Sequence, residues 1–391
     1  MTIERASAFA LLAALGAFQF SNAAGQILLA LAGIGWLISL IQSRATAAGR
    51  LRDRVPAFFL PLVLYAVWTL IATAYSRDPA TSLEDNKELL LYLVVPMTIG
   101  LLRGERAAQA LDVIITVGAG AALVGVFQST LLDYDNLGLR PHGTLGHYMT
   151  YSGVLMLLVC ATAARLLFQP GRRIWPALIM PALLVALAAT LSRNAYVGAL
   201  VGVAALFTLR DLRLMALLPI AVALMVILAP AVVVNRVYSM FDLKDLSNRD
   251  RVAMAQAGIG MIDDEPLTGV GPDMVARAYP EYRTDDAVEI QVQHLHNVPL
   301  HIAAERGLPA LALWLWFVVV AGRDLLRQVR QDRSVLAAAG LAALIAMVTA
   351  GMFEYNFGDS EFLVPLLALL TLPFAHKDMH PGMPVTHSGS R

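Results

Sequence analysis

The stretch HLHNVPLHIAAERGLPALALWLWFVVVA, residues 294–321, joins a histidine-rich polar segment to a run of apolar residues that begins near Leu308. Such a run is typical of a helix that crosses a membrane, and the rest of the chain repeats it. The 391 residues are 58% hydrophobic, with a mean hydropathy of +0.64, which exceeds what the core of a soluble protein can bury. The composition therefore predicts a polytopic membrane protein.

Apolar stretches that are long enough, or nearly long enough, to cross a hydrocarbon layer of ~30 Å recur along the chain. Helices satisfy their own backbone groups in lipid, and the ten-residue alternation of a barrel is missing, so we expect an all-α fold with about 12 transmembrane helices. An even number of crossings puts both termini on one side. The expected spans are residues 7–24, 26–42, 57–75, 89–102, 108–132, 151–168, 175–192, 195–209, 214–234, 308–321, 335–353 and 362–375.

Basic residues in short loops predict the orientation, because such loops stay cytoplasmic. One face of the predicted bundle carries most of them, so we assign that face and both termini to the cytoplasm. The opposite, outer face has fewer basic residues, mixed with many acids. The basic residues of the cytoplasmic face are Arg5, Arg44, Arg50, Arg52, Arg54, Arg103, Arg106, Arg165, Arg172, Arg173, Arg210, Arg213, Arg323, Arg327, Arg330, Arg333, Lys377 and Arg391.

Four further features narrow the class of protein. The first apolar stretch lacks a small-residue cleavage site, which indicates a retained helix rather than a signal peptide. The lone Cys160 lies inside an expected span, where it is predicted to pack as a small apolar residue. A formal net charge of zero disfavours a nucleic-acid partner. The composition of residues 379–391 predicts disorder.

These patterns predict four parts of the chain. Residues 1–234 hold the first nine transmembrane helices, and residues 308–375 hold the last three. Between them, residues 235–307 form one large periplasmic loop with the candidate catalytic motif, and residues 376–391 form a disordered cytoplasmic tail. A loop of this length usually has a function.

The large loop is acidic and contains one predicted helix. Residues 251–263 have the period of a helix, with Met254, Ala257, Gly258 and Met261 on one face. The prolines and glycines of residues 266–272 then predict turns.

Arginines stand out on the outer face. Arg193 lies at a tight turn between two spans, where it either meets an anion or extends to the interface as a snorkelling side chain. Arg140, Arg249 and Arg251 are each typical of solvated loop charges. Together with Arg193, they would converge on one polyanionic group, since guanidinium groups bind phosphate oxygens bidentately.

His296 is the candidate general base, because an imidazole titrates near neutral pH and accepts a hydroxyl proton. The alternative is a histidine hydrogen-bonded at the start of a helix. Asn297 is predicted to cap a short helix over residues 298–305, which Gly307 ends before Pro309 starts the next one. His294 and His301 are expected to be supporting or surface residues.

Three further interpretations stay open. His294 and His296 would bind a metal with oxygens from residues 263–265 or 285–286, although neither spacing is a recognised ligand pattern. Asp359, at an outer span end, would orient His296 or bind an acceptor sugar, or else be an exposed loop acid. Lys87 would pair with neighbouring acids or contact a phosphate.

Several of these motifs together resemble the O-antigen ligase and polymerase superfamily. The resemblance rests on Arg251, PLTGVGP at residues 266–272, and His296-Asn297 followed after nine residues by Gly307; Ser192-Arg193 and Arg140 with Gly143-Thr144 add to it. The spacing is similar to the His-Asn, nine residues, Gly-x-x-Gly pattern of lipopolysaccharide O-antigen ligases. Ala310 stands where that pattern ends in glycine.

The resemblance implies a glycosyltransferase of the lipid-carrier (GT-C) type in a bacterial inner membrane, with a periplasmic active site. It would transfer O-antigen from undecaprenyl diphosphate to lipid A-core, with inversion and without a metal or other cofactor. His296 would be the base, and Arg193 and Arg251, helped by Arg140 or Arg249, would bind the diphosphate. The alternatives are an O-antigen polymerase, a protein O-oligosaccharyltransferase and, disfavoured by spans nearly free of ionisable residues, a transporter.

Overall fold

The computed structural model describes residues 2–42, 55–169, 171, 173–228, 230–242, 245–285 and 287–376. Helices make up 78% of it, and the described residues contain no strand, so the all-α prediction is confirmed. The tail predicted after His376 lies outside the described residues. So do Asp286 and these predicted cytoplasmic residues: Arg44, Arg50, Arg52, Arg54, Arg172, Lys377 and Arg391.

Several helices are suited to a membrane. Among the described residues, four are long and apolar enough to cross it: α2 (Asn22–Gln42), α7 (Glu105–Leu131), α8 (Tyr148–Phe168) and α15 (Val298–Asp332). Shorter apolar helices run beside them, and the chain is therefore a multi-pass membrane protein, although the count of twelve spans stays a prediction. The shorter helices are α4 (Phe59–Ala74), α9 (Ile174–Ala189), α16 (Val335–Ala350) and α17 (Ser360–His376), with α1 (Ile3–Ala17), α6 (Val94–Leu101) and α10 (Arg193–Arg210) completing the bundle.

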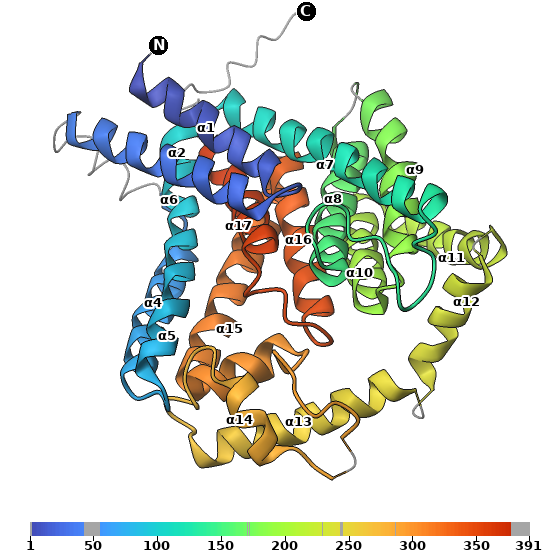
Figure 1. Ribbon diagram of the computed structural model, residues 1–391. Coiled ribbons are helices and arrows are strands. Elements are labelled where there is room, and N and C mark those ends of the chain that lie inside the picture. Colours follow the sequence, from blue (N-terminus) through green and yellow to red (C-terminus); the bar gives the residue numbers. More distant parts are fainter. Residues whose placement is uncertain are drawn as a thin grey trace, which may run out of the picture.

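The centre of the bundle is formed by α8, α16 and α17 (Figure 1), whose side chains are mostly buried. Small residues allow a close approach between α10 and α16. A Cβ atom on Gly198 would lie 2.9 Å from the carbonyl oxygen of Ala346, and one on Gly202 would lie 2.9 Å from that of Ala342. Glycines four residues apart thus let two helix backbones touch, as is common in membranes.

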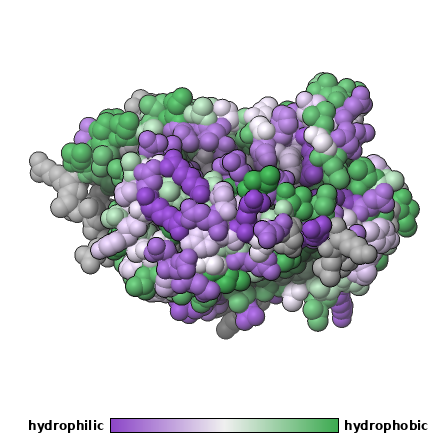
Figure 2. Space-filling model, turned by 60° about the horizontal axis from the view of Figure 1, so that its bottom comes forward, coloured by the Kyte–Doolittle hydropathy of each residue, from purple (hydrophilic) through white to green (hydrophobic). Residues whose placement is uncertain are grey.

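Polar contacts gather at the two ends of the bundle. At one end, the backbone of Gly104 bonds to Ala375, and Arg165 forms an ion pair with Asp112. Figure 1 shows the start of α1 and the end of α17 at this end, and α13 and α14 at the other. Figure 2 brings the α13 and α14 end forward and shows hydrophilic side chains over much of it, as expected for a surface outside the membrane.

The single span expected over residues 214–234 is wrong. The chain there forms a 3₁₀ turn, η2 (Leu212–Ala216), then α11 (Leu217–Leu228) and a separate α12 (Ala231–Tyr238). Pro230 precedes α12. Because proline lacks an N–H group and its ring clashes with the preceding turn, the helix ends before it. The short α12 therefore belongs to the polar end, and η3 (Ser239–Phe241) follows it.

The large loop folds into helices with a small core of its own. Its main helix, α13 (Leu246–Asp264), is longer than predicted, and the four residues of the predicted face, Met254, Ala257, Gly258 and Met261, are buried. The second helix is α14 (Val275–Tyr282), whose Val275 and Tyr279 join that core. Ala304 of α15 completes it, so the loop packs onto the first part of α15.

A kink in α15 connects the loop to the bundle. Asn297 caps the helix by accepting a hydrogen bond from the backbone of Leu300, and Gly307 breaks it with φ 78° and ψ 171°, as the sequence predicts. The turns of residues 266–272 cover the break: Val270 donates to Ala304, and Gly271 to Glu305. The PLTGVGP motif thus satisfies carbonyls that the kink exposes.

Candidate active site

A cavity of about 380 Å³ lies where the starts of α8 and α10 meet α12 and α13. Four arginines from different segments line it: Arg140 from the loop before α8, Arg193 from α10, Arg236 from α12 and Arg251 from α13. His296, which precedes α15, lines it as well. A concave surface with this concentration of positive charge is suited to a polyanionic group.

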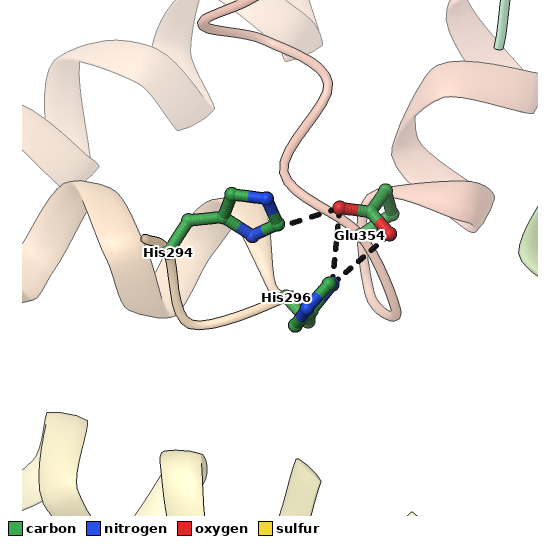
Figure 3. Close-up of side chains that lie close together, drawn as sticks. All are labelled: His294, His296 and Glu354. Carbon is green, nitrogen blue, oxygen red and sulfur yellow. Dashed lines mark hydrogen bonds and ion pairs between the residues drawn. The ribbon is translucent and has the colours of Figure 1, made fainter. Parts of the chain in front are cut away.

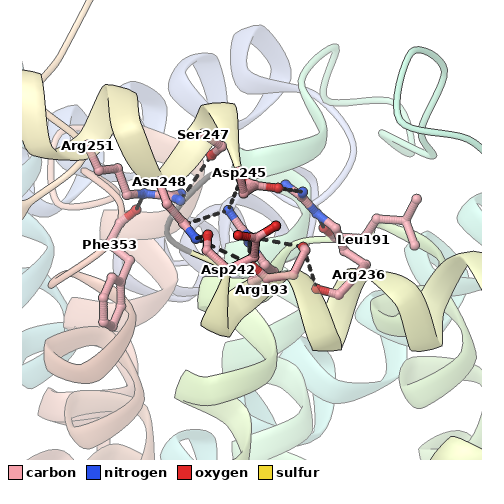
Figure 4. A network of polar contacts seen from close by, with 10 residues as sticks. Leu191, Arg193, Arg236, Asp242, Asp245, Ser247, Asn248, Arg251 and Phe353 are labelled. Atoms are coloured by element: carbon pink, nitrogen blue, oxygen red, sulfur yellow. Dashed lines mark hydrogen bonds and ion pairs between the residues drawn. The ribbon is translucent and has the colours of Figure 1, made fainter. Parts of the chain in front are cut away.

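Arg193 is held at the first turn of α10 by a dense set of contacts (Figure 4). Its guanidinium donates to the carbonyl of Ser239 at 2.9 Å, to Asn248 at 3.0 Å and to Asp245 at 3.3 Å, and the side chain is only 7% exposed. A helix N-terminus already carries partial positive charge, so a buried cation there requires a nearby anion. Asp245 supplies that anion.

Asp245 joins two of the arginines. Its Oδ1 accepts from Arg193, and its Oδ2 lies 3.7 Å from Nη1 of Arg236. Burial first, and then the charges of Arg193 and Arg140, lower the pKa of Arg236 to about 10. Positive charges therefore lie close together on this side of the cavity, with Asp245 as the bridging anion.

The other two arginines are held less tightly. Nε of Arg251 donates to the carbonyl of Phe353 at 3.3 Å, and its Nη1 donates to Ser247 at 3.1 Å. The guanidinium carbon of Arg140 lies 4.1 Å from the centre of the Tyr148 ring, a cation–π contact. Both guanidinium groups therefore keep hydrogen-bonding capacity for a ligand in the cavity.

His296 forms a pair with Glu354, a residue of the loop between α16 and α17 (Figure 3). Nδ1 of His296 lies 3.0 and 3.1 Å from the two carboxyl oxygens. Burial would raise the pKa of Glu354, but the hydrogen bond and charge of His296 and the charge of His294 lower it to about 2. A carboxylate only accepts hydrogen bonds, so Nδ1 of His296 carries a hydrogen, and in the neutral form of the ring Nε2 has the lone pair.

His294 lies on the other side of the same carboxylate. Its Nδ1 is 3.6 Å from Oε1 of Glu354, and burial lowers its pKa to about 4, against the opposing charge of Glu354. The side-chain nitrogens of His294 and His296 and the carboxyl oxygens of Glu354 all lie within 4.8 Å of one another. Among the described residues, the histidines therefore meet Glu354, and not the acids at 263–265 or 285 that the sequence suggested as metal ligands.

Comparison with known protein families places this site in context. Residues 177–315, about a third of the chain, match the family model described as O-antigen ligase. Over these residues the chain is similar to O-antigen ligases. The match supports membership of the O-antigen ligase superfamily, whose members are membrane glycosyltransferase-like enzymes. No curated protein matches the chain.

The matched residues 177–315 contribute part of the cavity. Arg193, Arg236, Arg251 and His296 lie within the matched residues, whereas Arg140 precedes them and Glu354 follows them. The predicted convergence of Arg140, Arg193 and Arg251 with His296 is thus present in the geometry. Their roles in binding and catalysis stay predictions.

Other residues that the sequence suggested for the site do not line this cavity. Arg249 is on the exposed side of α13, and Lys87 is exposed on η1 (Asn86–Leu93). Asp359 accepts a hydrogen bond from Thr150 at 3.0 Å and does not contact His296. Asn297 caps α15 and also donates to the carbonyl of Met352 at 3.0 Å, which supports the segment that carries His296.

Sequence reasoning missed two residues of this site as functional candidates. Arg236 lies just after the apolar run of residues 214–234 and within the predicted loop, where its charge alone does not distinguish it from the other loop arginines. Glu354 lies 58 residues from His296, and nothing in the local sequence pairs the two. The available signal was the position of Glu354 at an outer span end, the same signal that pointed to Asp359.

Proposed function

We propose that the protein is an O-antigen ligase, which transfers O-antigen from undecaprenyl diphosphate to lipid A-core at the periplasmic face of a bacterial inner membrane. The single observation that carries the proposal is one cavity lined by four arginines and by a histidine that is paired with a carboxylate. The matched residues 177–315 supply most of that cavity.

The arginines would bind the diphosphate. As the bond to the sugar breaks, the leaving diphosphate gains negative charge, and prepositioned guanidinium groups stabilise that charge in the transition state. Arg193 and Arg251 approach from α10 and α13, and Arg140 and Arg236 flank them. Arg249 lies outside the cavity, so we assign the diphosphate-binding role expected of Arg249 to Arg236 instead. Four such groups would supply the charge without a metal cofactor.

His296 would act as the general base. With the hydrogen on Nδ1 held by Glu354, the lone pair on Nε2 is available to take the proton of an acceptor hydroxyl. The buried carboxylate also stabilises the imidazolium that forms, as the aspartate of a catalytic triad does. Glu354 is therefore a positioning residue in this scheme.

The bond changes balance in one displacement. The acceptor oxygen attacks the anomeric carbon of the donor sugar as its proton passes to His296. The bond between that carbon and the diphosphate oxygen breaks, and undecaprenyl diphosphate leaves with the electron pair. Attack from the face opposite the leaving group inverts the anomeric centre. The imidazolium then returns its proton to water.

Supporting roles follow for residues around the cavity. Asn297 and His294 would hold the loop that presents His296, and Asp359, beside Thr150 at the start of α8, would contact the acceptor sugar. Lys87, which is exposed on η1, would contact the donor only as it approaches.

The test is a transfer assay with purified protein, a lipid-diphosphate glycan and a chelator. We expect joined product with lipid A-core, and its absence with both a lipid-linked glycan acceptor and an acceptor protein. Product on either of the latter would instead indicate a polymerase or a protein O-oligosaccharyltransferase. The variant His296→Ala should give no product, and His376→Gln, at the opposite end of the bundle, should match the wild type.

A further inference from the structure

Three side chains, those of His294, His296 and Glu354, lie as close together as the ligands of a metal ion. Nδ1 of His296 lies 3.0 Å from Oε2 of Glu354, and Nδ1 of His294 lies 3.6 Å from Oε1. A tetrahedral zinc ion with bonds of ~2.0–2.1 Å holds neighbouring ligand atoms about 3.4 Å apart. Both nitrogens also lie close to the same oxygen, Oε1, at 3.1 and 3.6 Å, and all the ligand atoms lie within 4.8 Å of one another, so side-chain adjustments would bring one atom of each residue onto one ion.

We infer that His294, His296 and Glu354 form a binding site for a zinc-like divalent cation, and that occupation of this site inhibits the transfer. The inhibitory part rests on the proposed function, since it depends on His296 as the base. The binding part rests on the three side chains alone.

The protein fixes these ligands before any ion arrives. Asn297, next to His296, donates to the carbonyl of Met352, and Val298 donates to that of Gly351 at 2.6 Å. The histidine segment is thus joined to the loop that carries Glu354. A site whose ligands are already held in place binds an ion with less loss of conformational freedom.

His294 supplies an independent observation. Its Nδ1 atom is buried, and no hydrogen-bond partner for it occurs among the described residues. Buried polar nitrogens are normally satisfied, so an unsatisfied one that lies beside a carboxylate indicates an additional partner. A cation held between the nitrogen and the carboxylate is such a partner.

The ligand set selects the metal. Two imidazole nitrogens and one carboxylate suit zinc, copper or nickel, whereas magnesium and calcium prefer oxygen ligands. The arginines of the cavity also repel a cation held by charge alone, so the nitrogen ligands must supply the affinity. Three protein ligands leave a fourth position for water.

Zinc would inhibit by changing the tautomer of His296. A metal bound at Nδ1 requires the hydrogen to move to Nε2, without any net gain or loss of protons by the ring. Nε2 then has no lone pair and accepts no proton from the acceptor hydroxyl. The same bond removes the hydrogen bond that orients the ring toward Glu354.

Titration calorimetry tests the site directly. Full-length protein carrying an affinity tag without histidine is titrated with zinc chloride and, separately, with magnesium chloride. We expect one zinc ion per chain and no magnesium binding. His294→Ala and Glu354→Gln should each weaken zinc binding at least ~10-fold, because a three-ligand site loses one ligand. The control His376→Gln removes a distant histidine and should bind as the wild type does.

Size-exclusion profiles and thermal unfolding verify that each variant is folded. If folded His294→Ala and Glu354→Gln bind zinc as tightly as the wild type, or if the wild type binds none, the inferred site is wrong. Either result leaves the proposed ligase function untouched.

The transfer assay tests the consequence. Zinc at saturating concentration should stop product formation in the wild type, and a chelator should restore it. If zinc binds at the three residues but transfer continues, inhibition is refuted and so is the role of His296 as the base. Binding without inhibition is thus distinguishable from absence of the site.

Discussion

Two histidines that lie a few residues apart in the sequence each pair with a glutamate, and the two pairs occupy different environments. His296 pairs with Glu354 at 3.0 Å and lines the cavity of about 380 Å³. His301 pairs with Glu305 at 3.3 Å, and both side chains are only 3% exposed. The two pairs consist of the same residue types, but only the pair that contains His296 is accessible to a ligand in the cavity. Residue type alone therefore does not identify a catalytic histidine.

The second pair belongs to a buried ion network at the kink of α15. Arg306 bonds to Glu305 and, at 3.0 Å, to Asp85 of α5 (Pro79–Asp85), while the indole of Trp68 donates to the carbonyl of Arg306. The adjacent space is only about 20 Å³. Buried charges of this kind must be paired, and here the pairing joins α4 and α5 to α15. We interpret this network as structural.

Removing each histidine gives the largest expected contrast. His296→Ala should lower transfer by at least ~10²-fold, because the general base is lost, in protein that is still folded at the assay temperature. His301→Ala should instead lower the free energy of unfolding by roughly 1–3 kcal/mol, because Glu305 loses a buried partner. Transfer assays and thermal unfolding of both variants check this. Equal losses of activity at normal stability would remove the distinction between the two pairs.

Arginine-to-lysine changes extend the comparison to the cations. Arg193→Lys should reduce transfer roughly 10²-fold, since a point charge does not replace a fork that holds several acceptors. Arg306→Lys should mainly destabilise the fold, by roughly 1–3 kcal/mol, because one ammonium does not serve both Asp85 and Glu305 in the same geometry. The measurement is the initial rate at matched membrane levels. Wild-type transfer in Arg193→Lys would contradict diphosphate binding there.

Much of this architecture is predictable from the sequence, because it depends on composition and periodicity. The apolar runs, the methionine face of α13, the cap at Asn297 and the break at Gly307 each follow from local rules. The failure at residues 214–234 is instructive. Pro230 was present in the sequence, but the apolar run around it masked the end of the helix.

The candidate active site is less predictable, because tertiary packing decides which of its residues contact one another. Arg193 and Arg251 stand out as charges at outer span ends, and the geometry brings both to the cavity. Arg249 is also a charge on the outer face, but it lies on the side of α13 that is exposed to solvent. The pairing of Glu354 with His296 depends on how the loop after α16 packs against the segment before α15, which no local sequence pattern predicts.

Asp245 offers a smaller test of the cavity. Because its carboxylate bridges Arg193 and Arg236, it competes with a diphosphate for both. Asp245→Asn should lower the KM for the lipid-diphosphate donor roughly two- to fivefold, as expected for a largely buried ion pair whose Coulomb attraction is mostly offset by desolvation. Glu289→Gln is the matched control, since Glu289 lines the cavity but shows no ion pair among the described residues. An unchanged or higher KM in Asp245→Asn would refute the competition.

Asp359, in the loop between α16 and α17, gives the smallest expected effect. Burial raises its pKa to about 7, against the hydrogen bond from Thr150, and the charge of Glu354 adds to the increase. Between the unfolded pKa of about 3.8 and the folded value, the folded protein binds more protons, so this group lowers stability as pH rises through that window. Asp359→Asn removes the free-energy cost of ionising this carboxyl group in the folded protein. The variant should therefore be more stable to heat than the wild type at pH 8, but not at pH 4. The control Asp135→Asn, at an exposed position, should show no such difference. Equal unfolding curves for the wild type and Asp359→Asn at both pH values would refute a proton-binding carboxyl group at Asp359.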